Sequence, residues 1–121
     1  MDFFKDLEDI RNSFRRFAQL LPEDGCLIIN GDIENYTEIT KDLPCRVITY
    51  GSDSSNDYYP EDMLQNEQGH MTFTLHSPSG VQTFHLKVPG THNVSNAMAA
   101  IALADFLGID PDVTGKGLAA F

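Results

Sequence analysis

The sequence has few basic residues: 8 lysines and arginines stand against 18 aspartates and glutamates, and the formal net charge is -10. Such an acidic surface repels the phosphates of nucleic acids and of anionic membranes, so we expect neither as a partner. No apolar run approaches the ~20 residues that a membrane-spanning helix needs. The first residues also lack the basic stretch and apolar core of a secretory signal, so we expect a cytoplasmic protein.

Cysteine is scarce as well. Cys26 and Cys45 each adjoin a short apolar run, and neither has the CxxC or Cys/His spacing of a zinc site. Two reduced, buried thiols are the expected state. A disulfide is possible if the two runs are neighbouring strands, although nothing in the sequence requires one.

Catalytic and phosphate-binding signatures are also missing. The sequence has no GxxxxGK[ST] loop, since Gly115-Lys116-Gly117 is too short, and it has no GxSxG or Ser/His/Asp pattern. Asp53 and Asp57 could bind a metal ion, but their loop lacks the glycine and glutamate placements of a calcium site, and a solvated loop is the expectation. We therefore predict no catalytic and no metal-binding residue, and no catalysis by this chain alone.

The length of 121 residues predicts a single domain with a modest core. Apolar residues at three- and four-residue spacing predict an amphipathic helix over residues 4–21. The polar face of that helix carries Arg11, Arg15 and Arg16, which could bind phosphate but are more typical of a solvated face.

Short apolar runs at residues 26–29 and 45–50 predict two strands, the first buried on both faces, with a short polar helix over 33–41 between them. This alternation predicts parallel pairing with a right-handed crossover.

The pattern then changes to three extended stretches, 58–64, 70–76 and 81–88, separated by turn sequences. Their alternation of apolar and polar residues predicts an antiparallel meander with one buried face and one solvent-exposed face. His76 and His85 lie on strands that could be neighbours, so a metal pair is conceivable. Surface histidines that have no carboxylate or thiol nearby are more often ordinary polar residues than metal ligands.

The last third is helical. Helical spacing begins at Val94 and stops at Gly108, a natural residue to follow a helix end. Asp110 is then the predicted N-cap of a further helix, with Pro111 at its first position. Together these patterns predict an α/β fold: short parallel strands with helices, plus an antiparallel three-stranded meander.

Polar side chains crowd the start of the helix that follows Pro89-Gly90. His92, Asn93 and Asn96 stand three and four residues apart, so we expect them to project from one edge of the first turn. The amide of asparagine matches the N6 donor and N7 acceptor of adenine. Helix capping by Thr91 or Asn93 is the competing interpretation, although one cap explains only one of these residues.

These residues carry a family resemblance. The segment 89–97, with Leu107-Gly108-Ile109 after its alanine-rich helix, resembles the G-x-H-N-x-x-N-A segment of the Mur ligases. Residues 2–10 with Phe14 resemble the helix after that family's magnesium-binding histidine. Asn30-Gly31-Asp32 and Thr49-Tyr50-Gly51 stand where the family has similar short motifs.

The resemblance implies that residues 1–121 are the C-terminal part of the central, ATP-binding domain, and the alanine-adding branch is the closest likeness. It implies an ATP- and magnesium-dependent ligase of peptidoglycan synthesis that joins L-alanine to UDP-N-acetylmuramate through an acyl-phosphate. It also places His92, Asn93 and Asn96 around adenine. The phosphate loop and the metal ligands of the family lie outside the sequence, so we expect a fragment that is inactive alone.

Two other interpretations stay open. The chain could come from another Mur-type or folylpolyglutamate-type amide ligase. It could also be a non-enzymatic binding module that uses the exposed edge of its meander to pair with partner strands.

Overall fold

The computed structural model describes residues 16–120. The helix predicted over residues 4–21 therefore lies mostly outside the described residues, as do Arg11 and Arg15, while residues 16–19 are helical. No helix of the described part is long and apolar enough to cross a membrane.

The first sheet consists of β1 (Cys26–Asn30) and β2 (Arg46–Tyr50), joined through the short helix α2 (Tyr36–Thr40). The strands are parallel, as predicted, and their register runs from the pair Cys26 and Arg46 to the pair Asn30 and Tyr50. The prediction of a first strand buried on both faces is wrong, because every residue of β1 is only half-buried. Within residues 16–120, β2 is the only strand that pairs with β1.

Both cysteines lie at the amino ends of this sheet. Both are free thiols; Cys45 is buried as expected, whereas Cys26 is only half-buried. Burial raises the pKa of the Cys26 thiol, and the neighbouring Arg46 partly offsets that effect.

The second sheet is the predicted antiparallel meander of β3 (Tyr59–Gln65), β4 (Met71–Ser77) and β5 (Gly80–Leu86), in that order. An isolated parallel bridge between Tyr50 and Tyr58 connects it to the first sheet. A β-bulge interrupts the pairing of β3 with β4 between Glu61 and Leu64.

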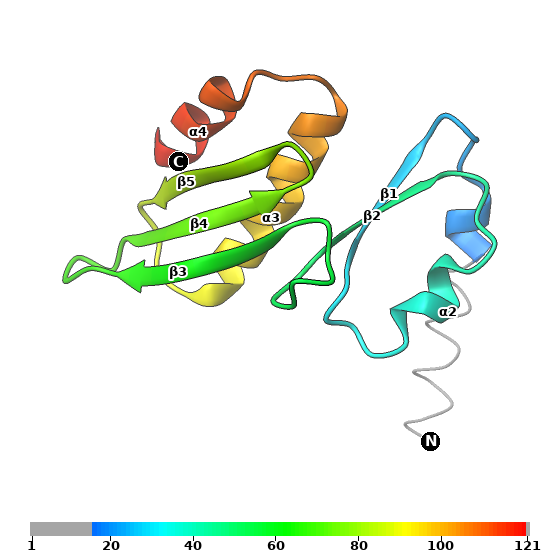
Figure 1. Ribbon diagram of the computed structural model, residues 1–121, viewed down its shortest axis with the longest axis horizontal. Coiled ribbons are helices and arrows are strands. Elements are labelled where there is room, and N and C mark those ends of the chain that lie inside the picture. Colours follow the sequence, from blue (N-terminus) through cyan, green and yellow to red (C-terminus); the bar gives the residue numbers. More distant parts are fainter. Residues whose placement is uncertain (1–15, 121) are drawn as a thin grey trace.

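Helix α3 (Thr91–Phe106) covers one face of the meander, and α4 (Pro111–Ala120) lies beside β5 (Figure 1). Gly108 ends α3 with a φ of 76°, as the sequence predicts. The carboxylate of Asp110 accepts a hydrogen bond from the Asp112 N–H at 2.8 Å, which confirms the predicted cap of α4.

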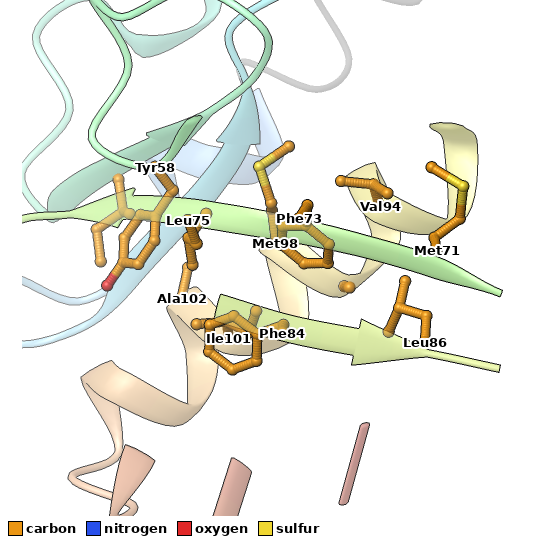
Figure 2. Close-up of a cluster of buried hydrophobic side chains, with 12 residues drawn as sticks. Tyr58, Met71, Phe73, Leu75, Phe84, Leu86, Val94, Met98, Ile101 and Ala102 are labelled. Atoms are coloured by element: carbon orange, nitrogen blue, oxygen red, sulfur yellow. The ribbon is translucent and has the colours of Figure 1, made fainter. Parts of the chain in front are cut away.

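The core lies between α3 and the meander. Apolar side chains alternate along β4 and β5 and meet a face of α3 that includes small alanines, which let the helix approach the sheet closely (Figure 2). Phe73 and Val94 are 0% and 1% exposed. Full burial of such a side chain contributes about 1.5–3 kcal/mol. The buried sheet and helix residues are Met71, Phe73, Leu75, Phe84, Leu86, Val94, Ala97, Met98, Ile101 and Ala102.

Candidate functional site

The start of α3 is shaped by Gly90, which occupies the N-cap position with a φ of 95°. A side chain there would be strained, and its Cβ would lie 2.9 Å from Cε1 of His92. No side chain caps the helix at this position. The capping interpretation of Thr91 and Asn93 is therefore wrong, and the polar residues of the first turn need another explanation.

Asn93 stabilises the turn that leads into the helix. Its side-chain Nδ2 donates a hydrogen bond to the Pro89 carbonyl at 2.6 Å. Its backbone N–H donates to the Gly90 carbonyl at 3.2 Å. One amide donor of Asn93 is thus used within the protein, while its Oδ1 has no hydrogen-bond donor among the described residues.

Asn93 and Asn96 line the same cavity, which has a volume of about 520 Å³. Asn96 is exposed, and within residues 16–120 its amide forms no hydrogen bond. The rest of the lining is apolar and comes from β5 and the loop after it, from α3 and from α4: Leu86, Val88, Ala97, Ala100 and Leu118. An apolar wall with two amides at one edge suits a flat heteroaromatic base, which needs both a stacking surface and directional hydrogen bonds.

His92 is exposed and does not belong to this lining; its ring lies against Gly90. The structure thus brings together two of the three predicted side chains around one cavity. Sequence reasoning missed Val88 and Leu118, because they approach α3 from other elements and no local pattern marks them.

The conceivable metal pair of His76 and His85 is absent. In the meander, His76 stands opposite Val81 and His85 opposite Thr72, so the two histidines are several residues apart along the strands. Nε2 of His76 lies 3.0 Å from Glu61 Oε2. The described residues contain no group of three or more side chains that could hold a metal ion.

The predicted solvated loop between Ser52 and Asp57 is also largely self-contained. Asp57 accepts a hydrogen bond from the Thr49 N–H at 2.9 Å, and Asp53 accepts one from the Ser55 N–H at 3.2 Å. Asp53 thus stabilises its own turn, whereas Asp57 fixes the loop to β2.

The short motifs after β1 and β2 meet at the carboxyl ends of these strands. The Asp32 carboxylate accepts hydrogen bonds from the backbone N–H and the hydroxyl of Ser52, both at 3.0 Å. Asn56 is 7% exposed and packs into the space left by Gly31 and Gly51. We name this cluster of Gly31, Asp32, Gly51, Ser52 and Asn56 the strand-end junction. It joins the two motifs tightly.

A parallel strand pair, a meander backed by a helix and an amide-edged cavity at that helix define the chain as an α/β domain with a candidate base-binding site. The Mur ligase middle domain model matches residues 1–104. The chain belongs to the Mur ligase family.

Curated relatives match the chain over its whole length. It is 47% identical to the UDP-N-acetylmuramate–L-alanine ligase of Agathobacter rectalis and spans 27% of that protein. It is 41% identical to the ligase of the same name from Acetivibrio thermocellus and spans 26% of it. The chain thus corresponds to about a quarter of the length of these relatives.

Solved structures share the fold. One is the UDP-N-acetylmuramoylalanyl-D-glutamyl-2,6-diaminopimelate–D-alanyl-D-alanyl ligase of Acinetobacter baumannii, with a TM-score of 0.72, 28% identity, and coverage of 89% of this chain and 23% of that one. Another is the MurF ligase of Thermotoga maritima in complex with ADP, with a TM-score of 0.76, 18% identity, and coverage of 99% of this chain and 27% of that one.

Proposed function

We propose that residues 1–121 are the C-terminal part of the central, ATP-binding domain of a cytoplasmic ligase that joins L-alanine to UDP-N-acetylmuramate in peptidoglycan synthesis. The observation that carries this proposal is the 47% identity over the whole chain to a relative of that name. In the proposed reaction, ATP converts the muramoyl carboxylate to an acyl-phosphate, which the amine of L-alanine then attacks.

The role assigned to this chain is to hold the adenine of ATP. Asn96 offers a free amide for the N6 donor and N7 acceptor of the base, the bidentate match that asparagine makes to adenine. The Nδ2 of Asn93 donates a hydrogen bond to the Pro89 carbonyl, and its Oδ1 remains available for the base. The family resemblance also assigns His92 to adenine; its ring lies outside the cavity lining and has to turn toward the base to stack on it or to donate one further hydrogen bond.

The cavity beside these amides supports the assignment to adenine. Its walls are mainly apolar, so a base that enters it loses contact with water on its faces while its edge reaches the asparagines. A phosphate group would find no such match, because the lining contains no charged side chain.

Magnesium and the phosphates are assigned to other parts of the protein. Within residues 16–120 no cluster of side chains fits a metal ion, and the sequence has no phosphate loop. The chain alone is therefore expected to bind ATP weakly and to catalyse no reaction.

The adenine site is tested by titrating the protein with adenosine and with guanosine, and by following the backbone amides by NMR. Replacement of a bidentate asparagine changes discrimination between bases by about 1–3 kcal/mol, so Asn96→Ala should weaken adenosine binding roughly 5- to 150-fold. Gln68→Ala removes an exposed amide from a turn outside the cavity and should leave binding unchanged. Equal binding of adenosine by the protein and by Asn96→Ala would contradict the assignment.

The reaction is tested with the whole protein that contains this chain. The expected result is ADP release that depends on both UDP-N-acetylmuramate and L-alanine. Activity only with a muramoyl peptide as acceptor would instead place the protein in another branch of the family.

A further inference from the structure

A second cavity lies at the opposite end of α3 from Asn93 and Asn96. It has a volume of about 380 Å³ and is formed where β2, the β4–β5 hairpin and the α3–α4 turn come together. Helix α3 has 16 residues and a rise of about 1.5 Å per residue, so roughly 24 Å of helix separates the two ends. This cavity plays no part in the proposed adenine site.

Side chains of opposite charge line this cavity without forming an ion pair. Arg46, Asp105 and Asp110 all line it. Among residues 16–120, no ion pair involves Arg46, so its guanidinium has no carboxylate within salt-bridge distance there. An arginine fork without a partner is suited to a carboxylate from a ligand.

The acidic side of the cavity is fixed in place. The Tyr58 hydroxyl donates a hydrogen bond to Asp105 Oδ2 at 2.7 Å, which leaves Oδ1 of Asp105 available. Burial raises the pKa of Tyr58 far above its usual value, and the hydrogen bond to Asp105 adds to this effect. The last turn of α3 contains no basic residue, and the carbonyl end of a helix favours a cation.

Apart from Ser79, the remaining wall is mainly apolar. Ile48 is buried, while Phe106 and Ile109 are 38% and 41% exposed and border the cavity. A ligand for this cavity therefore needs a carboxylate, an ammonium group and a small apolar body.

We propose that this cavity binds a free α-amino acid with an apolar side chain, with its carboxylate on Arg46 and its ammonium group on Asp105. The site is separate from the adenine site and goes beyond the proposed function, because an amino acid bound here lies at the far end of α3. Occupancy would connect β2, α3 and the β4–β5 hairpin through one ligand.

The test is a titration of the ¹⁵N-labelled protein with L-leucine into the millimolar range. Amide shifts are expected at Arg46, Ser79, Asp105 and Gly108, with none at Asn93 or Asn96. N-acetyl-leucine lacks the ammonium group and leucinamide lacks the carboxylate, so each should bind at least about tenfold more weakly, because each loses a charge-assisted hydrogen bond.

Two variants address the charges separately. Arg46→Gln should weaken leucine binding at least about tenfold, and Asp105→Asn, which keeps an acceptor for Tyr58, should do the same. The matched control is Arg16→Gln, which removes an exposed arginine outside the cavity. The proposal is overturned if leucine causes no shifts, if N-acetyl-leucine binds as well as leucine, or if Arg46→Gln binds normally. Adenosine reports on the other end of α3, so failure here leaves the adenine site untouched.

Discussion

The two sheets are held together by different kinds of contact. The meander buries one apolar face against α3, where Phe73 and Leu75 are 0% and 2% exposed. The parallel pair buries far less: β1 has no fully buried residue, and Ile48 is the buried residue of β2. Its strand-end junction is instead polar, built on Asp32 and Asn56. An apolar layer depends on filled volume, whereas a polar junction depends on the position of individual atoms.

The largest expected effect is in the apolar layer. Phe73→Ala should lower the free energy of unfolding by about 3–5 kcal/mol, because it removes a fully buried ring and leaves a cavity. Urea denaturation measures the change. Val81→Ala on the same sheet, at a position that is 63% exposed, should change stability by less than about 0.5 kcal/mol. Similar losses for both variants would show that the layer is not the stability core.

A smaller effect is expected in the strand-end junction. A Cβ on Gly31 would collide with the side-chain amide of Asn56, so Gly31→Ala should cost about 1–3 kcal/mol. Combining it with Asn56→Ala should cost less than the sum of the two single changes, because the collision is then relieved. Gly117→Ala meets open space in α4 and should stabilise the protein by about 0.4–1 kcal/mol. Additive losses in the double variant would contradict this account of the junction.

The smallest effect concerns the contact between the two sheets and α3. Tyr58→Phe removes the hydroxyl that binds Asp105 and should cost about 1 kcal/mol at neutral pH. The raised pKa of Tyr58 also makes stability depend on pH. The folded protein keeps this proton while an unfolded tyrosine loses it near about pH 10, so the contribution is complete below that pH and declines above it.

This pH dependence can be measured by comparing unfolding free energies of the protein and Tyr58→Phe on either side of about pH 10. The protein should lose more stability than the variant as the pH rises. Parallel curves would mean that Tyr58 ionises equally easily in both states.

Local patterns predicted most of the fold. The alternation of Met71, Phe73 and Leu75 gave the buried face of β4, and Gly108 and Asp110 marked where α3 ends and α4 begins, because these signals depend on neighbouring residues only. The half-buried state of β1 was not predicted, because burial depends on which elements pack around a strand.

The candidate site was predicted only in part. The spacing of Asn93 and Asn96 predicted that both amides project from one edge of the first turn, but not the cavity that they line. The hydrogen bond from Asn93 to Pro89 was not predicted either, because it depends on the shape of the turn at Gly90. Asn56 packs against Gly31 and Gly51, and Gly31 lies more than twenty positions from it along the chain. No local sequence pattern predicts such a contact. The sequence also did not predict the cavity between Arg46 and Asp105, because its lining comes from segments that are far apart along the chain.

The bulge in β3 affects how the meander behaves toward other chains. β3 is an outer strand of its sheet, and such strands offer unpaired backbone groups to any extended segment nearby. Here Pro60 lacks an N–H, Glu61 and Asp62 are charged, and Asp62 adopts a φ of 51° within the bulge. A regular row of donors and acceptors is therefore broken in the middle of the strand. The edge is poorly suited to strand addition, which disfavours the binding-module interpretation and protects the protein against edge-to-edge aggregation.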